Sequence, residues 1–309
     1  MEKFNFAGTG VALVTPFHDD SHKAVDYPAL ARLIDHTIAG GVSFLVSLGT
    51  TGETPTLTHD EQDAVLAFTL QHVAKRVPLV AGFGGNDTAK LVSAIKHFDF
   101  TGFAGILSAS PSYNRPTQEG IFRHYMALAE ATPVPMLLYN VPARTGSNIA
   151  AETTMRLATE AALRGAPIAG IKEASCNLAQ CAHLAKHKPE HFVLLSGDDN
   201  FTLALLAHGG EGLISVSANA FPYEVSTMVR HALDGDFVTA RTLHHALQDL
   251  TDLLFAEGNP AGIKAALELR EVCSASVRLP LVEASGELRN NLQREIVALR
   301  NTMLAAHHD

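Results

Sequence analysis

The chain has 309 residues, of which 47% are hydrophobic and 18% are charged, and this composition is typical of a globular protein with a sizeable core. The formal charge is −9 at pH 7 and no basic stripe is visible, which argues against nucleic acid as the main partner. No apolar run approaches the roughly 20 residues that cross a bilayer, so no membrane partner is expected.

Short apolar runs recur along the first two thirds of the chain at fairly regular spacing. Runs that are apolar at nearly every position are typical of parallel strands that are covered on both faces. The runs predict eight strands, at residues 11–17, 44–49, 78–84, 104–111, 135–142, 168–174, 192–199 and 212–220.

Amphipathic segments separate these runs and predict helices. The segment 58–76 begins with a capping box formed by Thr58 and Glu61, and the segment 117–132 begins with a polar first turn. Strand and helix alternating eight times predict an α/β fold, a (β/α)8 TIM barrel of about the usual 250 residues.

The pattern becomes wholly helical after the eighth strand. Helical periodicity is evident in residues 222–235, 237–255 and 287–307. We therefore expect two parts, a barrel over residues 1–221 and a helical extension over residues 222–309 that packs against it.

Lys172 lies inside the apolar run PIAGIKEAS, residues 167–175, at the carboxyl end of the sixth predicted strand. Active sites of such barrels lie at this end of the strands. Burial disfavours the charged form of a lysine, and a neutral amine can attack a ketone to form a Schiff base. The alternative is a strand-end lysine that reaches solvent and pairs with Glu173 or another carboxylate.

Three further features lie at the carboxyl ends of the second and fifth predicted strands, and each has a structural alternative. Tyr139 could shuttle a proton near an imine, or it could cap the core with its hydroxyl hydrogen-bonded. The turn GTTGE, residues 49–53, could hold a carboxylate or be only a glycine-rich turn. Arg144 offers a planar fork for a second carboxylate, or it could form a surface ion pair.

Three histidines, His183, His187 and His191, have the spacing of possible metal ligands. Pro189 interrupts their segment, and no carboxylate completes a ligand set. We expect no metal site and no cofactor.

The cysteines and the N-terminus indicate the compartment. Cys176, Cys181 and Cys273 are too few for a disulfide framework, and an odd number fits a reducing environment. The first residues, MEKFNFAGTG, lack the charged and then apolar order of a secretory signal. We expect a cytoplasmic protein.

Five motifs occur in order along the chain: GTTGE, SPSYNRPTQEG, YNVPARTG, GIKEAS and LLSGDD. With these motifs the chain resembles the dihydrodipicolinate synthases, which belong to the pyruvate-dependent class I aldolase family that includes N-acetylneuraminate lyase. The resemblance runs from VALVTPF to EGNPAGIKAAL and so covers most of the chain. It implies condensation of pyruvate with L-aspartate-4-semialdehyde to 4-hydroxy-tetrahydrodipicolinate, on the route to diaminopimelate and lysine.

The resemblance also implies four catalytic residues and a homotetramer built from two tight dimers. Lys172 would form the Schiff base with pyruvate, and Tyr139 would donate and accept protons. Thr50 and Tyr113 would complete a proton relay, with Tyr113 reaching in from a neighbouring subunit.

The same resemblance implies four substrate-binding residues. Thr51, with the adjacent backbone, would hold the pyruvate carboxylate, and the main chain of Ile214 would lie beside the pyruvate. Arg144 would receive the carboxylate of the second substrate, and the Gly197 backbone could assist it.

Departures from the family pattern are modest. Arg144 with Thr145 favours the synthase over the sialic-acid lyase, while Ser112 and GNPAGIK, residues 258–264, depart from the common synthase motifs. Neither departure is expected to change the chemistry at the imine. The alternatives are another pyruvate aldolase or dehydratase that uses Lys172 with a different aldehyde, and a barrel that only binds a keto acid.

Some synthases of this family bind lysine as an inhibitor at the dimer interface. His59 and Asn86 match the sensitive pattern, whereas Gln62, Lys90 and Ser112 replace a histidine, a glutamate and a tyrosine. A cation at Lys90 would repel the amino group of the inhibitor. We therefore predict weak or no inhibition by lysine.

Overall fold

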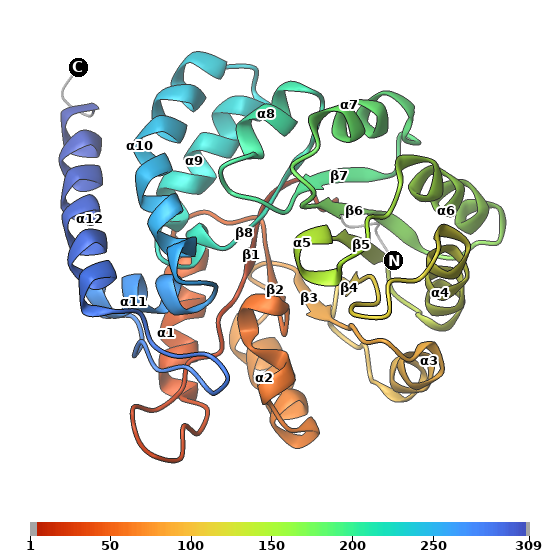
Figure 1. Ribbon diagram of the computed structural model, residues 1–309, viewed down its shortest axis with the longest axis horizontal. Helices are drawn as coiled ribbons and strands as arrows, with labels where there is room; N and C mark the ends of the chain where they lie inside the picture. The colour runs from red at the N-terminus through yellow and green to blue at the C-terminus, as the bar shows by residue number, and fades with distance from the viewer. Residues whose placement is uncertain (1–4, 307–309) are drawn as a thin grey trace.

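Eight parallel strands follow one another in chain order around a closed barrel (Figure 1). The computed structural model describes residues 5–306. The strands are β1 (Gly8–Ala12), β2 (Phe44–Ser47), β3 (Leu79–Gly82), β4 (Gly105–Ala109), β5 (Met136–Asn140), β6 (Ile168–Glu173), β7 (Val193–Ser196) and β8 (Gly212–Ser215). Pairing of β8 with β1 closes the ring. The predicted (β/α)8 barrel is confirmed.

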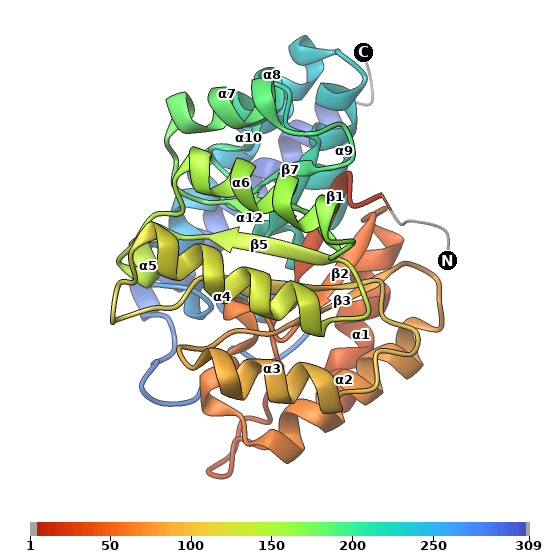
Figure 2. The same ribbon diagram turned by 90° about the vertical axis from the view of Figure 1, so that its right-hand side faces the viewer.

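Helices cover the outside of the barrel, and Figure 2 shows them following one another in chain order from α3 at the bottom to α7 near the top. They are α1 (Tyr27–Ala39), α2 (His59–Val73), α3 (Thr88–His97), α4 (Gln118–Ala131), α6 (Ala151–Leu163), α7 (Leu178–His187), α8 (Thr202–Ala207) and α9 (Pro222–Leu233). The short helix α5 (Pro142–Thr145) directly follows β5 at the rim of the barrel. The predicted capping box is present, since Thr58 N donates to Glu61 Oε2 at 2.9 Å and Glu61 N donates to Thr58 Oγ1 at 3.2 Å.

The first strand lies earlier in the chain than residues 11–17. A Cβ on Gly212 would lie 2.1 Å from the carbonyl oxygen of Gly8, so this glycine pair lets β1 and β8 approach closely. The N–H of Leu13 still donates to the Val46 carbonyl of β2 at 3.0 Å. The backbone then leaves the ladder, because Val14 N donates instead to the side chain of Asn219 at 3.1 Å.

The interior of the barrel has its own apolar cluster, separate from the larger core between strands and helices. Phe6 and Phe44 meet edge to face in it, with ring centroids 5.9 Å apart. Tyr139 and Ile214 belong to the same cluster. Both residues therefore face the barrel interior, where a site at the strand ends would lie.

Three more helices lie beside the barrel, on the left of Figure 1. They are α10 (Phe237–Ala256), α11 (Ala261–Leu269) and α12 (Gly286–Ala306), and they confirm the helical extension. Within the barrel ring α9 contacts β1, β8 and α1, and it also packs on α10. The division into residues 1–221 and 222–309 stays a prediction, and residue 307 of the last predicted helix lies outside the described residues.

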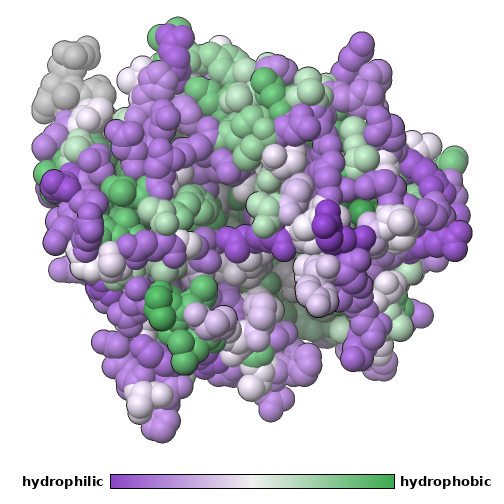
Figure 3. Space-filling model, in the orientation of Figure 1, coloured by the Kyte–Doolittle hydropathy of each residue, from purple (hydrophilic) through white to green (hydrophobic). Residues whose placement is uncertain are grey.

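Hydrophilic residues predominate on the face seen in Figure 1, and apolar side chains form separate patches between them (Figure 3). None of the helices within residues 5–306 is long and apolar enough to cross a membrane.

Candidate active site

Lys172 and Tyr139 lie side by side at the carboxyl ends of β6 and β5, where the register pairs them directly. Lys172 is 4% exposed and Tyr139 is 7% exposed. The Lys172 Nζ atom lies 4.3 Å from the centroid of the Tyr139 ring, within cation–π distance. Because both residues are buried and adjacent, an imine formed on the amine would lie within reach of the phenol.

Glu173, which follows Lys172 in the chain, is engaged elsewhere. Its carboxylate accepts hydrogen bonds from Asn140 Nδ2 at 2.9 and 3.0 Å, Gln180 Nε2 at 2.8 Å and Ser175 N at 2.7 Å. Over residues 5–306, no carboxylate forms an ion pair with Lys172. The strand-end ion pair considered as an alternative for Lys172 is therefore not formed.

Gly197 follows β7 and leaves room for the lysine side chain. A Cβ at this position would lie 2.7 Å from Ala174 Cβ and 3.0 Å from Cε and Cγ of Lys172. The Gly197 N–H donates to the Glu173 carbonyl at 2.8 Å, which fixes the backbone beside the amine. Only glycine fits here without displacing the lysine.

The turn after β2 carries the two predicted threonines. A 3-10 turn spans Thr50–Gly52, in which Thr50 is exposed and Thr51 is 2% exposed. Thr15 Oγ1 donates to the Gly52 carbonyl at 2.7 Å, which ties the turn to the loop after β1. Because the strands are parallel and closed into a barrel, this turn lies on the same rim as the end of β6.

A buried ion pair lies behind this turn, and sequence reasoning missed it. Lys264 Nζ on α11 lies 2.5 Å from Glu53 Oε1, and both side chains are wholly buried. The same Nζ donates to the Ser276 carbonyl at 2.8 Å and lies 4.1 Å from the centroid of the Phe17 ring. Burial lowers the pKa of Lys264 from its usual value. A lysine inside the apolar run GIKAAL was the available signal.

Arg278 extends this cluster toward α2. Its backbone N–H donates to Glu53 Oε2 at 3.0 Å. Its guanidinium bonds both carboxylate oxygens of Glu61, at 2.6 and 2.8 Å, and these bonds lower the pKa of Glu61 to about 2. The loop before α12 is therefore joined to the turn after β2.

Arg144 and Tyr113 are exposed at the rim. Arg144 lies on the short helix α5. Tyr113 follows β4, is 92% exposed and has a φ angle of 67°, a left-handed backbone conformation that is uncommon for an aromatic residue. Within one chain the Tyr113 ring is thus not packed against Tyr139.

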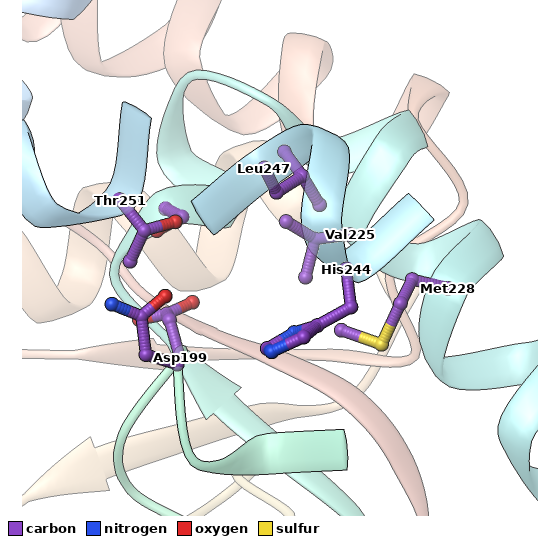
Figure 4. A pocket seen from close by; sticks show the side chains of 8 residues that line it. Asp199, Val225, Met228, His244, Leu247 and Thr251 are labelled. Atoms are coloured by element: carbon purple, nitrogen blue, oxygen red, sulfur yellow. The ribbon is translucent and has the colours of Figure 1, made fainter. Parts of the chain in front are cut away.

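The end of β8 is held by Asp199 from the loop after β7. Its carboxylate accepts from Ser215 Oγ at 2.5 Å and from Val216 N at 3.0 Å, while Ile214 is fully buried. Burial raises the pKa of Asp199, and these hydrogen bonds oppose the rise. Asp199 also borders a pocket between α9 and α10 (Figure 4), whose lining does not include Lys172 or Tyr139.

His183 and His187 are adjacent on α7, with ring centroids 4.5 Å apart. Within the described part of the chain, no group of three His, Cys, Asp or Glu side chains is arranged to hold a metal ion.

Comparison with known proteins identifies the family. Residues 5–299 match the model of the dihydrodipicolinate synthetase family. The chain belongs to this family. It is therefore an enzyme of the lyase class. A 4-hydroxy-tetrahydrodipicolinate synthase of Phocaeicola vulgatus is 49% identical over 275 residues, which cover 89% of this chain and 91% of the relative.

Solved structures of this family share the fold. The 4-hydroxy-tetrahydrodipicolinate synthase of Methylacidiphilum fumariolicum SolV superposes with a TM-score of 0.92 at 38% identity, covering 98% of this chain and 99% of that one. A dihydrodipicolinate synthase of Acinetobacter baumannii, described as complexed with pyruvate, has a TM-score of 0.89 at 34% identity, covering 96% and 99% of the two chains.

Substituting Gly197 with alanine tests the packing around Lys172. The new methyl group would overlap with Ala174 Cβ and crowd the lysine stem, so Gly197→Ala should lower the free energy of unfolding by about 1–3 kcal/mol. Urea denaturation at fixed protein concentration measures the change. Gly286→Ala is the control, because a Cβ at Gly286 meets no atom within 4 Å. An unchanged stability of Gly197→Ala would contradict the packing argument.

Proposed function

We propose that the protein condenses pyruvate with L-aspartate-4-semialdehyde through a Schiff base on Lys172, giving 4-hydroxy-tetrahydrodipicolinate for diaminopimelate and lysine biosynthesis. The observation that carries this proposal is the buried amine of Lys172 beside the phenol of Tyr139, with no carboxylate paired to the amine in residues 5–306. The names of the relatives, and the pyruvate complex of the Acinetobacter protein, support the choice of substrates.

The chemistry begins when the neutral amine of Lys172 attacks the ketone carbon of pyruvate. Loss of water gives an imine, which withdraws electrons and lets the pyruvate methyl group lose a proton. The resulting enamine attacks the aldehyde carbon of the second substrate and forms the new carbon–carbon bond. The amino group of the second substrate then attacks the imine carbon, which closes the ring and breaks the bond to Lys172, so that the free amine is regenerated. Each step moves a proton near the imine nitrogen, and Tyr139 is the donor and acceptor we assign to it.

Thr50 and Tyr113 would connect Tyr139 to solvent as a proton relay. Tyr113 is 92% exposed on its own chain, so it fits a residue that completes the site of a neighbouring subunit. We therefore propose a homotetramer assembled as a dimer of dimers. All three cysteines are free, which supports a reducing compartment, and we propose the cytoplasm.

Each of the two substrates carries a carboxylate that needs its own binding group. We assign the pyruvate carboxylate to Thr51 and the adjacent backbone, with the main chain of Ile214 beside the substrate. We assign the carboxylate of L-aspartate-4-semialdehyde to Arg144, whose planar fork matches two carboxylate oxygens. The Gly197 N–H already donates to the Glu173 carbonyl, so the Gly197 backbone would assist through its carbonyl oxygen, which can accept from the amino group of the same substrate.

Reduction with borohydride in the presence of pyruvate tests the Schiff base. Borohydride reduces an imine to a stable amine, so we expect one covalent adduct on Lys172, located by peptide mass spectrometry. Lys172→Ala should give no adduct. Lys186→Ala should be labelled like the natural chain, because Lys186 is exposed on α7. Labelling at another lysine would contradict the proposal.

Arg144 variants test the second substrate. Arg144→Ala should lower kcat/KM for L-aspartate-4-semialdehyde by about 10- to 100-fold, since a hydrogen bond to a charged group is worth about 1.5–3 kcal/mol. Arg144→Lys keeps the positive charge but lacks the planar guanidinium fork, so its kcat/KM should lie between that of the natural chain and that of Arg144→Ala. Labelling by pyruvate should persist in both variants. An unchanged kcat/KM would favour a different aldehyde.

The region that binds lysine in some family members differs here, and we propose weak or no inhibition by lysine. The side chain of Lys90 on α3 is 87% exposed, and its Nζ atom lies 3.9 Å from Asp87 Oδ2. Asn86 Oδ1 accepts from Ser112 N at 2.8 Å and from Ser112 Oγ at 3.2 Å. The Gln62 side chain donates to two backbone carbonyls. These residues offer no carboxylate to the inhibitor's amino group at position 90.

Initial rates with added L-lysine test this proposal. We expect less than half inhibition at about 1 mM lysine. Lys90→Glu supplies the missing carboxylate and should increase the sensitivity, whereas Lys96→Glu, on an exposed position of the same helix, should not. Strong inhibition of the natural chain below 1 mM lysine would refute it.

A further inference from the structure

Asn259 reaches the candidate active site from outside the barrel. It lies between α10 and α11, and its Nδ2 donates to Thr51 Oγ1 at 3.0 Å. Asn259 is 9% exposed and Thr51 is 2% exposed. The two residues are 208 positions apart in the chain, so the contact exists only because the helical extension packs on the barrel.

The hydrogen bond from Asn259 sets the acceptor and donor roles of the Thr51 hydroxyl. An amide N–H group only donates, so Thr51 Oγ1 acts as the acceptor toward Asn259. The hydroxyl proton of Thr51 is then left to donate elsewhere. Within residues 5–306 no hydrogen bond from this hydroxyl is formed. The proton is thus not committed to another group in this part of the chain.

The other end of the Asn259 side-chain amide is left without a partner within residues 5–306. Its Oδ1 atom is buried and has no hydrogen-bond donor within the described residues. Buried acceptors are paired in most proteins, and an unpaired one destabilises the fold. Within the described residues the Asn259 side chain therefore makes its hydrogen bond to Thr51 alone.

The buried pair behind the turn keeps Asn259 in place. Lys264 follows Asn259 by five residues and lies on α11, with its Nζ atom 2.5 Å from Glu53 Oε1. Glu53 joins the 3-10 turns Thr50–Gly52 and Thr54–Thr56. The start of α11 is thereby anchored to the turn that carries Thr51. The relative position of Asn259 and Thr51 is set by this anchor.

We propose that Asn259 is a positioning residue that aims the hydroxyl proton of Thr51 into the barrel mouth, where it donates to the carboxylate of pyruvate. This assignment rests on the proposed function of Lys172 and Thr51. It makes the helical extension part of the substrate site, although the extension supplies no group that reacts.

Borohydride trapping over a range of pyruvate concentrations tests this role. Asn259→Asp has the same size but replaces the donor by an acceptor, which draws the Thr51 proton away and adds a negative charge. The pyruvate concentration for half-maximal labelling of Lys172 should rise at least about tenfold. The labelling at saturating pyruvate should stay as in the natural chain. Asn259→Ala removes the donor alone and should give a smaller rise.

Two controls separate positioning from a merely structural role. Asn290→Asp adds the same charge at an exposed position of α12 and should leave the half-maximal concentration unchanged. In Thr51→Val the hydroxyl is gone, so adding Asn259→Ala, which removes the donor without adding a charge, should produce much less than the additive effect.

Three results have distinct meanings. An unchanged half-maximal concentration in Asn259→Asp, or a fully additive double variant, would overturn the role of Asn259. A loss of labelling at saturating pyruvate in both Asn259 variants would assign the residue to folding and overturn it too. Failure of the natural chain to label at Lys172 would instead overturn the proposed function.

Discussion

The burial of one lysine amine without an ion-pair partner is the constraint on which the site depends. Removing an ammonium from water costs several kcal/mol unless a partner compensates, and Lys172 is 4% exposed with no paired carboxylate in the described part of the chain. Neighbouring residues keep the Lys172 amine buried and without an ion-pair partner. Gly197 leaves space for the side chain, and Asn140, Gln180 and Ser175 occupy the adjacent carboxylate of Glu173.

A second buried lysine shows the opposite solution. Lys264 is wholly buried as well, but it is paired with Glu53 and donates to the Ser276 carbonyl. A charge satisfied in this way is suited to holding two segments together, since removing either partner would leave the other unpaired. The unpaired lysine is the reactive one in our account, and the paired lysine supports the turn beside it.

The sequence was sufficient for the barrel and for the neighbourhood of Lys172. Near-continuous apolar runs identified the strands, and the closed order of parallel strands then brings the ends of β5 and β6 together. The contacts of Asn259 and Lys264 could not be predicted, because no periodicity links positions 208 and 211 residues apart. The early end of β1 likewise depends on a contact between residues far apart in the chain, the hydrogen bond from Val14 N to the Asn219 side chain. The role we propose for Tyr113 would involve a second chain, which one sequence does not describe.

A crystal structure of the enzyme after reduction with pyruvate and borohydride tests the account most directly. Our account predicts a covalent bond from Lys172 Nζ to the former ketone carbon, with the carboxylate against the turn Thr50–Gly52 and within hydrogen-bond distance of Thr51 Oγ1. A carboxylate bound to Arg144 instead, or an adduct on any other residue, would contradict it.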